Sequence, residues 1–150
     1  LRVGRWRGNA LLVHPATRAL TTMPDTLHHI LHVEDDPAIR RIVALALGRV
    51  GGFEVRSAES GAEALHMLSQ ALPQLLLLDV MMPDMDGPML LSQLRARDDT
   101  ATLPVMFMTA KGSDDERAHL RQLGAVAVLE KPFDPMTLAA VVRQHWAAQT

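Results

Sequence analysis

The sequence has no cysteine, and it lacks any long apolar run. Without cysteine the chain can form neither disulfide bonds nor thiolate metal sites, so we expect a reducing, cytoplasmic location. Because no apolar run approaches the roughly 20 residues that cross a bilayer, we expect no membrane span. The length of 150 residues suits a single domain with its own core.

Acidic residues are absent from the first 24 residues, which contain four arginines. The remaining chain carries 11 basic and 17 acidic residues, a net charge of −6. A body of that charge argues against a nucleic-acid surface and suits a site that binds a cation. We expect residues 1–26 to be a disordered N-terminal extension, with an organellar presequence as the alternative, and residues 27–150 to form the domain.

Five short apolar runs alternate with longer amphipathic segments from residue 27 onward. Each run has the length of a strand and has turn residues nearby. The longer segments read as helices. This alternation predicts an α/β fold, a doubly wound parallel sheet of five strands with helices on both faces. The predicted strands are 29–33, 53–58, 75–79, 104–109 and 126–130.

Residues that cap helices mark the expected boundaries. A cap followed by proline at the first helical position occurs at Asp36-Pro37 and again at Asp134-Pro135. Ser60 with Glu63, and Ser113 with Glu116, have the spacing of capping boxes. Asp86 is the expected cap of the third helix. Glycine stops follow the first helix at Gly51-Gly52 and the fourth at Gly124.

Charged side chains gather at the predicted carboxyl ends of the strands, the edge at which folds of this class bind ligands. Glu34 and Asp35 follow the first strand, and Asp79 ends the third. Three converging carboxylates repel one another, and a hard cation such as Mg²⁺ would resolve the repulsion. Thr109 and Lys131, at the ends of the fourth and fifth strands, suit a phosphoryl group. Asp79 would then be the nucleophile that forms an acyl phosphate.

Four motifs, each at a predicted strand end, make the chain resemble a response-regulator receiver domain of two-component signalling. They are "VEDDP" (33–37), "LLLLDVMMPDMDG" (75–87), "VMFMTAK" (105–111) and "EKPFDP" (130–135). The resemblance covers residues 27 to 148. It implies the flavodoxin-like strand order 2-1-3-4-5 and a switch that catalyses only its own phosphorylation and dephosphorylation. It also implies a histidine kinase or histidine phosphotransfer protein as phosphodonor, an unknown output protein, and a monomer or weak dimer.

The resemblance also implies a role for each site residue. Asp79 would be the phosphoacceptor. Asp35 would ligate Mg²⁺ directly and Glu34 through water, with Asp79 and the backbone carbonyl of Met81 as further ligands. The side chains that would contact the phosphoryl oxygens are Thr109 and Lys131, and the Lys131-Pro132 bond would be cis.

Residues at four positions bear on how the switch would operate and how long it would last. The family often has an aromatic residue three positions before the lysine, and this chain has Val128 there. We therefore expect Thr109 to act on the loop 110–116 and on the face of the fourth helix, fifth strand and fifth helix without help from a ring. In the family it resembles, the residues two beyond the phosphoacceptor and two beyond the threonine tune dephosphorylation. Here these residues are Met81 and Lys111, and the apolar Met81 predicts slow phosphate loss.

Other readings place the chain in different classes. A phosphohydrolase of the haloacid dehalogenase type would need a second acid two residues after its nucleophile, where this chain has Met81. A flavodoxin-like electron carrier would need a hydroxyl-rich phosphate loop in place of "EDDP". We expect a stand-alone receiver, with a fragment of a longer regulator or hybrid kinase as the alternative. His28, His29 and His32 should be packed or solvated and should not share a metal site, since His29 points away from the other two.

Overall fold

The computed structural model describes residues 25–110 and 112–149. Most of the expected N-terminal extension, residues 1–24, lies outside this part of the chain, as does Lys111. Within the described ranges, every helix is too short or too polar to cross a membrane.

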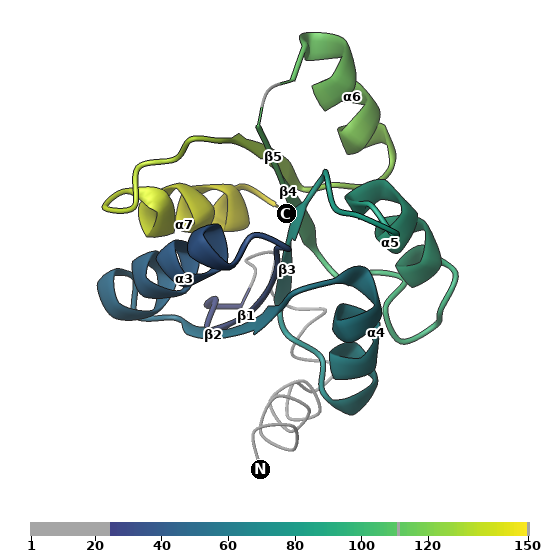
Figure 1. The fold of residues 1–150 in the computed structure, drawn as a ribbon, viewed down its shortest axis with the longest axis horizontal. Helices are drawn as coiled ribbons and strands as arrows, with labels where there is room; N and C mark the ends of the chain where they lie inside the picture. The colour runs from purple at the N-terminus through teal and green to yellow at the C-terminus, as the bar shows by residue number, and fades with distance from the viewer. Residues whose placement is uncertain (1–24, 111, 150) are drawn as a thin grey trace.

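A five-stranded parallel sheet forms the centre of the domain, in the order β2-β1-β3-β4-β5 (Figure 1). Both the predicted class and the predicted order are confirmed. Each observed strand matches its prediction to within one residue at either end. Because β3 lies in the middle, it pairs on both sides and presents both faces to the core. The strands are β1 (His29–Val33), β2 (Glu54–Ala58), β3 (Leu75–Asp79), β4 (Val105–Thr109) and β5 (Ala127–Glu130).

The leucine run of β3 shows why this strand is central. All four leucines are fully buried. Successive side chains of a strand point to opposite faces, so the run serves two cores. Leu75 and Leu77 pack in one cluster, and Leu76 and Leu78 pack in the other. A continuous apolar run is what a strand buried on both faces requires.

Helices cover both faces of the sheet (Figure 1). On one face lie α3 and α7, whose apolar residues pack in the first cluster together with the π-helical segment η1 that continues α3. On the other face lie α4, α5 and α6, which contribute to the second cluster. The first set is α3 (Pro37–Leu45), η1 (Ala46–Val50) and α7 (Leu138–Ala148), and the second is α4 (Gly61–Gln70), α5 (Gly87–Arg95) and α6 (Asp114–Gln122).

Four of the expected caps are in place. The side chains of Asp36, Ser60, Asp86 and Ser113 each accept a backbone N–H at the start of α3, α4, α5 and α6. The glycine stops also hold, since Gly52 and Gly124 have positive φ after η1 and α6. These boundaries were readable because a cap is a local hydrogen bond between near neighbours in sequence.

The predicted start of the last helix is wrong by one turn. Asp134-Pro135 does not begin α7, which starts at Leu138 after Thr137. Instead, the Asp134 carboxylate accepts the amide of Met136, and its carbonyl accepts the amides of Thr137 and Leu138. The aspartate therefore closes a turn ahead of the helix, and its carbonyl also accepts an i→i−4 bond from Leu138, the first residue of α7.

Candidate functional site

Three carboxylates meet at the carboxyl edge of the sheet. Glu34 and Asp35 directly follow β1, and Asp79 is the last residue of β3. Because β1 and β3 are neighbours, with Val33 opposite Leu78, the two chain segments end side by side. One carboxylate oxygen from each residue lies within 4.8 Å of the others. Glu34 and Asp79 are buried, with 1% and 4% of their surface exposed, whereas Asp35 faces solvent.

A lysine ammonium bridges two of these carboxylates. Lys131, the residue after β5, donates from Nζ to Glu34 Oε1 at 2.8 Å and to Asp79 Oδ1 at 3.0 Å. Its backbone N–H donates to the Thr109 carbonyl at 2.7 Å, which fixes the lysine to the end of β4. The Lys131-Pro132 peptide bond is cis, as the resemblance implied.

Burial and hydrogen bonding shift the pKa values of Lys131 and Glu34 in opposite directions. Burial alone would lower the pKa of Lys131, but the hydrogen bonds to Glu34 and Asp79 raise it above its usual value of 10.5. Burial raises the pKa of Glu34, and Asp79 adds to the rise, while Lys131 and the Asp36 amide oppose it. Lys131 is therefore a full positive charge at neutral pH and balances much of the acidic cluster.

The loop that carries Glu34 and Asp35 is held on several sides. The Glu34 amide donates to the Ala58 carbonyl of β2 at 3.0 Å, and the Asp36 amide donates to Glu34 Oε2 at 3.2 Å. The Asp36 carboxylate caps α3, so it stands outside the carboxylate cluster, as we expected. Arg40 Nη1 donates to the carbonyls of Glu34 and Asp35 at 2.8 and 3.3 Å. Sequence reasoning missed this arginine, and its only signal is a place one turn after the cap.

The other expected site residues lie around the same edge. Thr109 is buried at the end of β4, one strand beyond Asp79. Met81, two residues after Asp79, exposes 74% of its surface in the loop before α5. Val128 is buried in β5 and packs in the cluster that includes Phe107. The structure thus brings Glu34, Asp79 and Lys131 into hydrogen-bonding contact, with the Asp35 carboxylate within 4.8 Å of the other two acids. Thr109, Met81 and Val128 lie at or near the same edge of the sheet.

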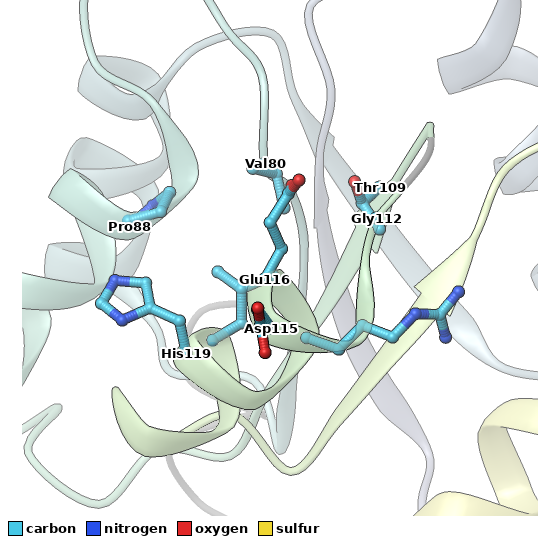
Figure 2. A pocket seen from close by; sticks show the side chains of 9 residues that line it. Val80, Pro88, Thr109, Gly112, Asp115, Glu116 and His119 are labelled. Atoms are coloured by element: carbon cyan, nitrogen blue, oxygen red, sulfur yellow. The ribbon is translucent and has the colours of Figure 1, made fainter.

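A hollow of about 350 Å³ opens beside Thr109, between α5 and α6 (Figure 2). Its wall includes Val80, which follows Asp79, and Gly112 in the loop before α6. Asp115 and Glu116 from the first turn of α6 line the hollow, with the Glu116 side chain extending towards Val80, and His119 lies on the side of Pro88 (Figure 2).

The strand histidines form no metal cluster within the described residues. His28 is exposed, while His29 is buried with Nδ1 3.6 Å from Glu54 Oε2. His32 is fully buried, and among the described residues neither of its ring nitrogens has a hydrogen-bond partner. Burial, with help from the charges of Lys131 and Arg40, lowers its pKa to about 3, so the ring is neutral.

The donor set fits a hard divalent cation. Glu34, Asp35 and Asp79 supply carboxylate oxygens, which are the ligands that Mg²⁺ prefers. The exposure of the site also suits a metal ion that keeps some of its water ligands. Asp35 faces solvent, so its carboxylate oxygens and the cluster can be reached by water from that side.

Comparison with known proteins gives a consistent result. A family model described as "Response regulator receiver domain" matches residues 30–143. Response regulator Rre1 of Synechocystis sp. is 41% identical over 120 residues, which is 80% of this chain and 52% of Rre1. An uncharacterized 14.6 kDa protein of Leptolyngbya boryana is 37% identical over 79% of this chain and 90% of its own length. The chain spans about half the length of most curated relatives it matches.

Solved structures show the same likeness. Chemotaxis response regulator CheY4 of Vibrio cholerae superposes with a TM-score of 0.73 at 30% identity, covering 80% of this chain and 99% of CheY4. A putative response regulator from Chloroflexus aurantiacus superposes with a TM-score of 0.71 at 36% identity, covering 80% of this chain and 98% of that one.

Proposed function

We propose that this chain, which belongs to the family of response regulator receiver domains, is a phosphorylation-switched signalling module whose phosphoacceptor is Asp79. One observation carries the proposal: the Lys131 ammonium bonds Asp79 and Glu34 at the edge where Asp35 also lies. A nucleophilic carboxylate, a fixed cation and a cation-binding pair of acids are the groups that phosphoryl transfer to an aspartate needs.

In the proposed reaction, an Asp79 oxygen forms a bond to phosphorus while the bond to the donor atom breaks. The donor leaves with that electron pair. Lys131 would exchange part of its pairing with Asp79 for a phosphoryl oxygen, and the Thr109 hydroxyl would donate to another. Mg²⁺, held by Asp35, Asp79, the Met81 carbonyl and, through water, Glu34, would neutralise charge on the phosphoryl oxygens.

The partners follow from the same role. The phosphodonor would be a histidine kinase or a histidine phosphotransfer protein, and the output partner would bind the face made by α6, β5 and α7. The receiver would extend over residues 27–150 and act in the cytoplasm as a monomer or weak dimer. Hydrolysis of an external phosphate ester is not favoured, because Met81 offers no acid–base group where a haloacid dehalogenase needs one.

Phosphorylation by acetyl phosphate tests the proposal. With Mg²⁺, the protein should gain one phosphate that is stable to acid and labile to base, as an acyl phosphate is. Asp79→Asn should not be labelled. Asp84→Asn is a matched control, because Asp84 lies in the following loop with φ 68°, a conformation that asparagine accepts. Equal labelling of Asp79→Asn and the parent would disprove the assignment.

A further inference from the structure

Arg40 contacts the main chain of the loop that carries two of the three clustered acids. It lies on α3, one turn after the Asp36 cap, and its guanidinium reaches back to the loop that carries Glu34 and Asp35. Nη1 donates to both backbone carbonyls of that loop, at 2.8 Å to Glu34 and 3.3 Å to Asp35. Nη2 lies 4.0 Å from a carboxylate oxygen of Glu59, the residue after β2. One planar side chain therefore connects the loops that follow two neighbouring strands.

The two cations near the cluster bond different atoms. Lys131 donates to carboxylate oxygens of Glu34 and Asp79, the same atoms that a metal ion or a phosphoryl group needs. Arg40 donates to carbonyl oxygens of the main chain, so it fixes the loop and leaves the carboxylate oxygens available. A guanidinium suits this task because its donors form a rigid fork, whereas an ammonium is a point charge on a flexible stem.

We infer that Arg40 is a positioning residue for the divalent cation: it holds the backbone of Glu34 and Asp35 so that their carboxylates face Asp79. This inference rests on the proposed function, since it assigns a role in the same cation site. The direction in which Mg²⁺ affinity changes when Arg40 is replaced distinguishes a positioning role from a purely electrostatic one. Removing a nearby positive charge should strengthen the binding of a cation, whereas loss of a positioning contact should weaken it.

The test is a titration of the protein with Mg²⁺ alone, followed by calorimetry and by the amide signals of residues 34–36. We expect Arg40→Gln to raise the Kd for Mg²⁺ by about tenfold, the lower end for groups that orient metal ligands. Arg41→Gln is the matched control, because Arg41 is the exposed neighbour and its loss removes the same charge. It should bind Mg²⁺ as the parent does or slightly more tightly.

A conservative variant distinguishes the effect of the guanidinium's planar geometry from the effect of its charge. Arg40→Lys keeps the positive charge but cannot reproduce the planar contact to both carbonyls, so it should bind as weakly as Arg40→Gln. With acetyl phosphate, both variants should need more Mg²⁺ for half-maximal labelling yet approach the parent's rate when Mg²⁺ saturates. Circular dichroism and urea unfolding would verify that each variant is folded at the temperature of the titration.

Two results would overturn the inference: tighter or unchanged Mg²⁺ binding in Arg40→Gln, or full affinity in Arg40→Lys. If Arg41→Gln weakened binding as much as Arg40→Gln, overall charge would explain the effect and the inference would also fail. The parent separates these failures from a failure of the proposed function. A parent that neither binds Mg²⁺ nor accepts phosphate refutes the function, whereas an active parent with an unaffected Arg40→Gln refutes only the positioning role.

Discussion

A buried imidazole lies two residues before the acidic Glu34. His32 occupies the second-to-last position of β1, is fully buried, and has no hydrogen-bond partner for either ring nitrogen within residues 25–110 and 112–149. A buried polar group left unsatisfied costs about 1–3 kcal/mol. The residue therefore reduces stability at the strand that presents Glu34 and Asp35.

Replacing this imidazole with an apolar side chain should stabilise the fold. We expect His32→Leu to raise the free energy of unfolding at pH 7 by about 1–3 kcal/mol. Urea unfolding would measure the change. His28→Leu is the control one residue before the start of β1, and it should stay within about 0.5 kcal/mol of the parent because His28 is exposed. A destabilised His32→Leu would contradict the prediction and show that the ring makes net favourable contacts in the folded state.

The same histidine should make the fold sensitive to acid. The pKa of His32 is about 3 in the folded state, against 6.5 in a model peptide. Between these values the unfolded chain binds a proton that the folded chain does not, so stability falls as the pH falls from 6.5 towards 3. Without divalent cations, the parent should lose more stability than His32→Leu across this window. If the unfolding free energies of the two proteins changed with pH in the same way, His32 could not be the source of the acid sensitivity.

Met81 should control how long the phosphoryl group survives. Its side chain is apolar and 74% exposed two residues after Asp79, so it cannot orient an attacking water by a hydrogen bond. We expect slow phosphate loss in the parent and faster loss in Met81→Asn, followed by the decay of labelled protein. Met89→Asn is the control, since Met89 is also exposed, at 50%, but lies on α5. An unchanged or slower decay in Met81→Asn would contradict the prediction.

At the scale of elements, close packing of α5 against the end of β3 depends on Gly87. A Cβ at this first residue of α5 would lie 2.6 Å from the Asp79 carbonyl oxygen and 2.8 Å from Phe107 Cε1. We expect Gly87→Ala to cost about 1–3 kcal/mol, because the helix must move away from the strand that holds Asp79.

Gly48→Ala in η1 should have the opposite effect on stability and raise the free energy of unfolding. There the nearest atom to an added Cβ is the Phe53 carbonyl oxygen at 3.8 Å, an ordinary contact. Alanine is favoured over glycine inside a helix by roughly 0.5–1 kcal/mol, so this variant should be more stable. Thermal unfolding of the two alanine variants would check both signs, and equal effects would refute the packing argument.

The segment between β4 and α6 should carry the signal away from Asp79. Thr109 ends β4 beside the hollow that α6 borders, and Val128 is too short and stiff to replace a mobile ring. A phosphoryl mimic such as beryllofluoride should shift amide signals from Thr109 through residues 112–123, and Thr109→Ala should abolish the shifts in α6. Shifts confined to residues 34–36 and 79 would place the switch elsewhere.

Elements that depend on near neighbours in sequence were predictable, and those that depend on distant contacts were not. The leucine run revealed β3 because burial on both faces requires a continuous apolar strand, and Asp86 revealed the start of α5 through its own cap. Arg40 was missed because its role is set by where its side chain folds back. The start of α7 was misplaced because Asp134 can close a turn or cap a helix with the same atoms.

At the scale of the whole molecule, the acidic cluster should link cation binding to stability. Lys131 balances much of the cluster's charge, and Mg²⁺ should add stability by binding only the folded state. At a Mg²⁺ concentration of about ten times Kd, the gain should be about 1.4 kcal/mol. Thermal unfolding with and without Mg²⁺ at constant ionic strength would measure it. Asp35→Asn should lose most of the gain, and an undiminished gain would place the ion elsewhere.

The separation between Lys131 and its partners also affects how the protein is made. Glu34 and Lys131 are 97 residues apart in sequence, although their side chains are 2.8 Å apart. A ribosome releases the chain from its N-terminus, at about 5–20 residues per second. All three acids therefore emerge seconds before the lysine that balances two of them. During that interval the nascent chain holds its carboxylates without their built-in counter-ion, and the edge of the sheet is completed only when the last strand leaves the exit tunnel.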